Sequence, residues 1–269
     1  MDHLCEKYLH LLGIRKREPG LEGLKEVVWA QMSIVPFENI SKLLYKKRLG
    51  QTHLVSFEQY LEGIEKYHFG GTCYANNFYL NQLLSWLGYE VKLCGAEMHM
   101  PDLHLVNIVC LGDQEFLVDT GFAAPFSEPL PLNLSTDYTI ISGSSKYLLQ
   151  HPDADGLHRM GQYRDGVLTH GYRINTLARE IGEFEQVIGN SFRPESTFMN
   201  NLLVTRFARD KFLSLRNMTL TESTPETSNK QTLGSRQELA QVIEKRFGIP
   251  QEIVLESIVG ISLGDAAHC

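Results

Sequence analysis

The segment Phe69-Gly70-Gly71-Thr72-Cys73-Tyr74-Ala75-Asn76-Asn77 decides the fold, because it places a thiol at the start of a helix. An apolar pattern of helical period follows the cysteine and ends at a capping glycine: Leu80, Leu83, Leu84, Leu87 and Gly88. The N–H groups of a first helical turn lack partners and the helix dipole is positive there, so this position favours a thiolate. The sequence therefore predicts that Cys73 is a nucleophile.

A predicted hairpin downstream supplies the other groups that a cysteine nucleophile requires. His104 begins the strand-like run 104–110, Asp119 ends the run 115–119, and Gly112-Asp113 forms the turn between them. Because the turn lies midway, antiparallel pairing brings the two side chains close together. Acyl transfer needs a base, a group that orients the base, and a donor to the oxyanion such as the Cys73 N–H. We expect Cys73, His104 and Asp119 to form a catalytic triad.

Other interpretations of these residues are open at this point. A cysteine after two glycines is more often structural, a histidine at a strand start is usually an ordinary polar residue, and an aspartate before Thr-Gly can simply form a turn. His68 and His99 are rival bases. His99, Asp102 and His104 also resemble metal ligands, but their spacing crosses a loop with Pro101 and lacks the helical i,i+4 register, so we expect no metal.

Composition excludes several classes of protein. A chain of 269 residues with 43% apolar and 21% charged residues suits two or three small domains around a cleft. The net charge of −7 and the absence of long Lys/Arg blocks disfavour nucleic-acid binding. Five cysteines without CxxC spacing disfavour a disulfide framework and a Cys-rich zinc site. Neither a secretory leader nor a membrane-length apolar run is present, so we expect a cytoplasmic protein with no membrane partner.

Periodicity divides the chain into a helical part, a strand-rich part and a mixed part. Helices are predicted around 4–12, 21–32, 56–66 and 73–87. Strands are predicted at 89–94, 104–110, 115–119, 138–141, 146–150, 157–163 and 167–174, with a loop at 122–136, which suggests a barrel or small sandwich. The last third is predicted as strand-like runs at 202–207 and 212–220, a polar loop at 221–232, and helices at 235–247 and 251–258.

Five segments together resemble the arylamine N-acetyltransferase family, in the right order. Residues 35–40 are similar to its P-F-E-N segment, and residues 69–77 to its R-G-G-x-C-x-E-x-N motif. Residues 103–106 resemble the strand with the base, and residues 118–122 its D-V-G-F segment. Residues 193–206 resemble the segment that opens its third domain. Two charged positions of the nucleophile motif differ, because Phe69 replaces Arg and Ala75 replaces Glu. Ala123-Ala124 stands where the family usually has glycines.

The resemblance implies an α+β fold with a cysteine-protease/transglutaminase-like catalytic core. Its expected domains are an N-terminal helical bundle with the cysteine (1–88), a central antiparallel β-barrel with His and Asp (89–192), and a C-terminal α/β lid (193–269). It also implies that Phe37 and Phe122 line the acceptor pocket.

The implied activity is a ping-pong reaction of the kind used in xenobiotic metabolism. Cys73 takes the acetyl group of acetyl-CoA and passes it to an arylamine, arylhydrazine or N-hydroxyarylamine. Acetyl-CoA is the donor substrate, and no metal takes part. Two alternatives stay open: a related acyltransferase, amide synthase or thioester hydrolase with the same triad, and a catalytically weak member that binds an acyl or CoA ligand. The altered residues Phe69 and Ala75 motivate the second alternative.

Overall fold

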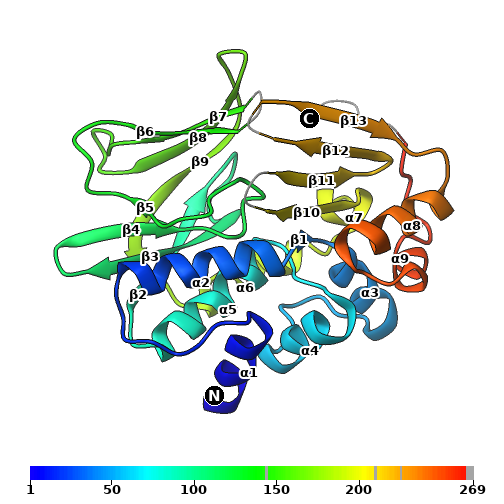
Figure 1. Ribbon diagram of the computed structural model, residues 1–269, viewed down its shortest axis with the longest axis horizontal. Coiled ribbons are helices and arrows are strands. Elements are labelled where there is room, and N and C mark those ends of the chain that lie inside the picture. Colours follow the sequence, from blue (N-terminus) through cyan, green and yellow to red (C-terminus); the bar gives the residue numbers. More distant parts are fainter. Residues whose placement is uncertain (143–144, 209–210, 225, 265–269) are drawn as a thin grey trace.

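The computed structural model describes residues 1–142, 145–208, 211–224 and 226–264, and shows an α+β fold. Two antiparallel sheets lie side by side, with the N-terminal helices beneath them and two C-terminal helices at the far end of the smaller sheet (Figure 1). Among the described residues, no helix combines the length and the apolar character needed to cross a membrane. Cys269 lies outside the described residues.

The helical part contains the four predicted helices and one that the sequence pattern misses. The helices are α1 (Asp2–Leu11), α2 (Leu21–Ile34), α3 (Ile40–Leu49), α4 (Phe57–Tyr67) and α5 (Cys73–Trp86). Ser56 caps α4 by accepting a hydrogen bond of 3.1 Å from the Gln59 N–H. The buried apolar residues of α3 are confined to its first half and three basic residues fill its last turn, so its apolar stripe is too short to stand out.

The larger sheet contains every strand that the middle of the sequence predicts. Its order is β5-β4-β3-β2-β9-β8-β7-β6, and it curves into a nearly closed barrel. The strands are β2 (Glu90–Glu97), β3 (His104–Leu111), β4 (Gln114–Val118), β5 (Leu130–Pro131), β6 (Tyr138–Ser142), β7 (Ser145–Gln150), β8 (His158–Arg164) and β9 (Val167–Ala178). The short strand β5 lies inside the predicted loop at 122–136, which is a correction.

The smaller sheet corrects the prediction for the last third. Its order is β1-β10-β11-β12-β13, with β1 (Phe37–Glu38), β10 (Leu203–Phe207), β11 (Phe212–Arg216), β12 (Thr219–Ser223) and β13 (Ser228–Thr232). The run 212–220 is therefore not one strand, because the chain turns at Asn217, whose φ is +49°. The predicted polar loop at 221–232 forms β13 and most of β12, whose many polar residues hide the strand pattern.

Five further helices among the described residues complete the fold. These are the 3-10 helix η1 (Ile181–Phe184), α6 (Glu185–Asn190), α7 (Thr197–Asn200), α8 (Arg236–Phe247) and α9 (Gln251–Ser257). Helices α8 and α9 pack with α3 and the smaller sheet around Phe69 and Phe247. Since β1 comes from the N-terminal third but pairs with β10, the parts of the chain are interlocked. The division at residues 88 and 192 stays a prediction.

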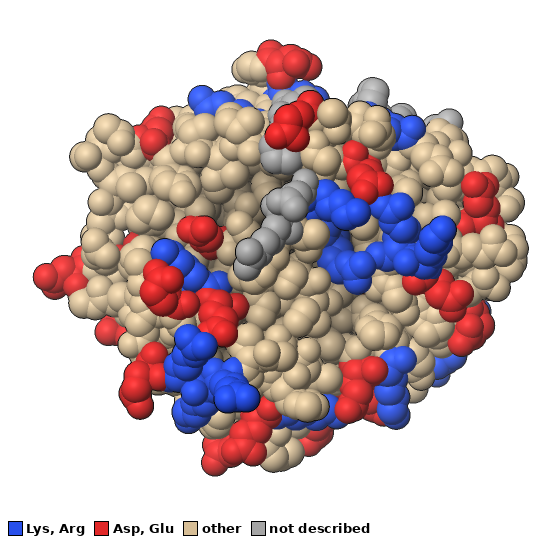
Figure 2. All heavy atoms as spheres, viewed as in Figure 1, with Lys and Arg blue, Asp and Glu red and all other residues tan. Residues whose placement is uncertain are grey.

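Lys and Arg side chains gather over β10 and β11 on the face shown in Figure 2. Arg206 donates hydrogen bonds to the carbonyls of Arg246 and Phe247 at the C-terminal end of α8, and Arg246 pairs with Glu222 at 2.6 Å. Cations at a helix C-terminus stabilise the helix through its dipole, so Arg206 has a structural role at the end of α8.

Candidate active site

Cys73 is the first residue of α5 and is buried, with 5% of its surface exposed. The chain around it approaches other segments so closely that only glycine fits. A Cβ atom at Gly70 would overlap the Pro36 carbonyl oxygen, and one at Gly121 would lie 2.6 Å from Cys73 Cα. These contacts hold the nucleophile loop between the segment before β1 and the loop after β4. The predicted helix start at Cys73 is confirmed.

His104 and Asp119 form a buried pair. His104 begins β3, and its Nε2 lies 2.8 Å from Asp119 Oδ2. The ladder between β3 and β4 ends at the pair Asn107–Val118, so Asp119 lies one residue beyond it, where the chain leaves the strand. Cys73 Sγ lies 4.0 Å from the carbonyl oxygen of Leu103, the residue before His104. The structure therefore brings together the three residues that the sequence singles out.

The electrostatics of the pair favour an imidazolium beside a carboxylate. Burial opposes the charge on His104, but the Asp119 carboxylate and the nearby Cys73 thiol outweigh it and raise the pKa of His104 to about 10. Burial likewise opposes the charge on Asp119. Its pKa is nevertheless lowered by His104 and by hydrogen bonds from Tyr172 and Asn77. A protonated His104 can stabilise a neighbouring thiolate.

Two residues outside the predicted triad hold Asp119 in place. Tyr172 in β9 donates a hydrogen bond of 2.6 Å to Asp119 Oδ2, the same oxygen that His104 contacts. Asn77 in α5 donates one of 2.9 Å to Asp119 Oδ1. Asn77 belongs to the nucleophile motif 69–77, so its place in the sequence could have identified it as a site residue. Tyr172 carries no signal, because nothing in the sequence distinguishes it from other strand tyrosines.

The two predicted substrate-binding residues lie in different surroundings. The ring of Phe122 lies 5.7 Å from that of His104 and stacks on His170 at 5.3 Å, so it borders the buried pair. Phe37 is buried in β1, contacts Phe198 edge-to-face at 5.9 Å, and forms a bridge with Gly71 in the nucleophile loop. Their roles in substrate binding stay a prediction.

The rival candidates do not contact the Asp119 carboxylate. His68 ends α4 with a φ of +53° and lies against Gly248. Neither His68 nor His99 has a hydrogen bond to Asp119 among the described residues. Within that part of the chain, no three His, Cys, Asp or Glu side chains are grouped to hold a metal ion.

Phe69 and Ala75, which replace charged residues of the family motif, both pack among apolar side chains. Phe69 packs against Tyr45 and Tyr67, with ring centroids 6.1 and 5.2 Å away. Ala75 is buried in the core of the helical part. Glu38 has no cation within 4.0 Å among the described residues, and instead accepts hydrogen bonds from the Gly70 N–H and from the N–H and hydroxyl of Ser41. Burial raises its pKa, which these bonds oppose.

Comparison with known families agrees with this arrangement. A family model described as N-acetyltransferase matches residues 20–255, which is most of the chain. The chain belongs to this N-acetyltransferase family. Its curated relatives include the pineal gland isozyme NAT-3 of arylamine N-acetyltransferase from Gallus gallus, 32% identical over 125 residues, or 44% of this chain and 41% of the relative.

A second curated relative is named for a different acyl group. It is an N-malonyltransferase from Fusarium pseudograminearum, 28% identical over 157 residues, or 52% of this chain and 45% of the relative. The matches thus span less than half the length of these two relatives.

Solved structures show the same fold over almost the whole chain. The arylamine N-acetyltransferase of Mycobacterium marinum, in complex with CoA, has a TM-score of 0.80 at 22% identity and covers 94% of this chain and 98% of its own. The predicted fold class, with its helical part and curved antiparallel sheet, is therefore confirmed.

Proposed function

We propose that this N-acetyltransferase moves an acetyl group from acetyl-CoA to the amine of an arylamine, arylhydrazine or N-hydroxyarylamine, through an acetyl-Cys73 intermediate. The observation that carries the proposal is the buried His104–Asp119 pair, joined at 2.8 Å next to a cysteine on a helix start. Family membership and the CoA bound to the Mycobacterium marinum protein support CoA as the carrier of the acyl group.

In the first half-reaction Cys73 attacks the thioester. Before the attack, the proton of the Cys73 thiol already resides on His104, and Asp119 stabilises this imidazolium. The thiolate adds to the carbonyl carbon of acetyl-CoA, and the Cys73 N–H at the start of α5 can donate to the oxyanion. When the carbon–sulfur bond to CoA breaks, the CoA sulfur takes the proton from His104. Acetyl-Cys73 and CoA thiol are the products.

In the second half-reaction the amine takes the acetyl group. The amine nitrogen adds to the carbonyl carbon of acetyl-Cys73, and His104 removes a proton from that nitrogen. The Cys73 thiolate leaves, and the proton on His104 balances its charge. Phe122 borders His104 and presents an apolar ring to the reaction site, which suits an aromatic acceptor.

Malonyl transfer is a second candidate, favoured by the relative that is named an N-malonyltransferase. The triad chemistry would be unchanged, because malonyl-CoA carries the same thioester. Only the surroundings of the acyl group would need to accept a carboxylate.

Intact-mass spectrometry tests both candidates directly. The protein is incubated with acetyl-CoA or malonyl-CoA without an acceptor, and the expected result is one added acyl group that peptide mapping places on Cys73. Cys73→Ala should gain nothing, whereas Cys94→Ala, which alters another buried cysteine, should behave as the wild type. A folded wild-type protein that gains no acyl group from either donor contradicts the proposal.

A further inference from the structure

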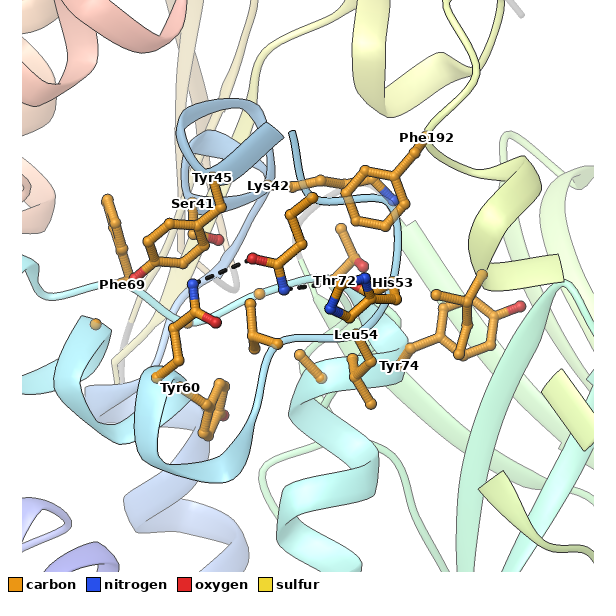
Figure 3. Close-up of a pocket in the computed structure, with 18 of the residues that line it drawn as sticks. Ser41, Lys42, Tyr45, His53, Leu54, Tyr60, Phe69, Thr72, Tyr74 and Phe192 are labelled. Carbon is orange, nitrogen blue, oxygen red and sulfur yellow. Dashed lines mark hydrogen bonds between the residues drawn. The ribbon is translucent and has the colours of Figure 1, made fainter. Parts of the chain in front are cut away.

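Lys42 is a half-buried cation without an anionic partner beside the site. It lies in α3, and its Nζ is 2.5 Å from Ser191 Oγ and 3.9 Å from the centre of the Phe192 ring (Figure 3). Across the described part of the chain, no carboxylate lies within 4.0 Å of this ammonium group. An ammonium group has three N–H donors, so two of them have no acceptor among these residues.

The side chain of Lys42 lines a cavity of about 50 Å³ next to the nucleophile loop. Figure 3 shows the Lys42 side chain running along this cavity towards Phe192. Much of its wall is apolar or aromatic, formed by Tyr45, Leu54, Val55, Phe69, Ile188 and Phe192. None of its lining residues is an aspartate or a glutamate. Lys42 is half-buried, so its ammonium group keeps only part of its contact with water and can pair with an anion that enters this cavity.

The cavity has room for a small anion. A volume of about 50 Å³ accommodates a group such as a carboxylate with the carbon that carries it. The apolar wall suits the short carbon chain of such an acid.

The cavity adjoins the nucleophile. Two of its lining residues, Thr72 and Tyr74, flank Cys73 in the chain. Phe192 belongs to the same apolar cluster as Cys73 and lies under the Lys42 ammonium group. Burial lowers the pKa of Lys42 to about 8, and the nearby Cys73 opposes this shift.

We propose that Lys42 and this cavity bind the carboxylate of a short organic acid. The acid is either free in solution or part of the acyl group that Cys73 accepts, and only the second source rests on the proposed function. In both cases the Lys42 ammonium group pairs with the carboxylate, and Ser191 orients the ammonium group through its hydroxyl.

Calorimetric titration with sodium malonate at constant ionic strength tests the site. We expect saturable binding by the wild type and at least a tenfold weaker affinity in Lys42→Met, because a charged hydrogen-bonded pair is lost. Lys46→Met is the matched control: Lys46 lies one turn further along α3, bonds to the Phe192 carbonyl, and does not line the cavity. Its affinity should equal that of the wild type. Lys42→Gln replaces Lys42→Met if the latter does not fold.

Equal affinity in the wild type and a folded Lys42 variant, or no binding by the wild type, overturns the proposal. The source of the acid follows from initial transfer rates with malonyl-CoA and acetyl-CoA. A ratio of malonyl to acetyl transfer that falls about tenfold in Lys42→Met identifies the acyl group as the occupant. An unchanged ratio with weakened malonate binding identifies a free acid. Malonate binding that depends on Lys42 without transfer from either donor refutes the proposed function and leaves the site intact.

Discussion

Asn77 Nδ2 donates a hydrogen bond of 2.9 Å to Asp119 Oδ1, which bonds the helix that begins at Cys73 directly to the acid of the buried pair. The same Asn77 Nδ2 atom also lies 2.5 Å from the Leu105 carbonyl oxygen in β3. The Asn77 Oδ1 atom accepts a hydrogen bond of 2.9 Å from the Thr120 N–H. One side chain therefore fixes the positions of α5, β3 and the loop after β4 relative to one another.

Asn77→Ala should impair both stability and turnover. It leaves several buried polar groups without partners, so the free energy of unfolding should fall by about 3 kcal/mol. Turnover should fall roughly 10- to 100-fold, because Asp119 is no longer held relative to Cys73. Urea unfolding and acetyl-transfer assays measure the two effects. Asn81→Ala is the control, since Asn81 lies one turn further along α5 and bonds to Asn107 instead. Equal effects of the two substitutions would refute the role of Asn77.

Tyr172→Phe isolates the hydroxyl group that contacts Asp119 Oδ2. The ring should keep its packing, with centroids 4.8 Å from those of His104 and Phe122. The hydrogen bond from Tyr172 helps to lower the pKa of Asp119, so its loss should raise that pKa. Because the carboxylate is lost as pH falls through this pKa, the acid limb of the pH–rate profile should move to higher pH. Tyr147→Phe, a buried barrel tyrosine, should leave that limb in place.

The sequence predicts the triad residues of the candidate site, but not all of the residues that hold them in place. Cys73, His104 and Asp119 were identifiable because a helix start and a hairpin turn determine their positions through local geometry. Tyr172 was not identifiable, because its contact with Asp119 depends on how β9 crosses the curved sheet. Such a contact joins residues that are 53 positions apart. No local pattern encodes it.

The same distinction explains the errors in the fold. Most helices and barrel strands carry a clear period, and they were predicted. Helix α3 and strand β13 do not, because the basic last turn of α3 shortens its apolar stripe and β13 consists of polar residues held by pairing with β12. The sequence of the run 212–220 predicts one continuous strand, because no break in its pattern marks the turn at Asn217.

Stability should depend on pH through His104. Its folded pKa is raised from 6.5 to about 10, so the folded state binds more protons than the unfolded state between these values. The stabilisation is fully present below pH 6.5 and is lost as pH rises through about 10. The wild type should have a higher free energy of unfolding than His104→Gln, by on the order of a few kcal/mol at low pH. This difference should shrink as pH rises from 6.5 to about 10.

Urea unfolding at several pH values measures that difference. His158→Gln is an informative control, because burial lowers the pKa of His158 instead. Above pH 6.5 the free energy of unfolding of this variant should change with pH as that of the wild type does. A difference between the wild type and His104→Gln that is constant across the window would contradict the raised pKa.

Phe69→Arg should not recreate the charged motif of the family. The new side chain would be buried among Tyr45 and Tyr67, so the free energy of unfolding should fall by about 3–5 kcal/mol. Phe69→Leu keeps the site apolar and should cost less, about 1–2 kcal/mol. Adding Ala75→Glu should not restore stability, because residues 69 and 75 pack in different apolar clusters, although both line the cavity next to the nucleophile loop, and a second buried charge adds its own desolvation cost. Chemical denaturation of Phe69→Arg, Ala75→Glu and the double variant gives the coupling energy between the two positions. A double variant more stable than Phe69→Arg would contradict this expectation.

Ala123→Gly should stabilise the protein. Ala123 has a φ of +57°, a left-handed conformation that costs a residue with a Cβ roughly 1–2 kcal/mol. Glycine adopts it freely but loses more entropy on folding, so the net gain in the free energy of unfolding should be about 0.5–1 kcal/mol. Ala124→Gly is the control: Ala124 is buried without a positive φ, so its loss should destabilise. Thermal melting distinguishes the two, and a lower melting temperature for Ala123→Gly would show that the Ala123 methyl group contributes packing that outweighs the backbone strain.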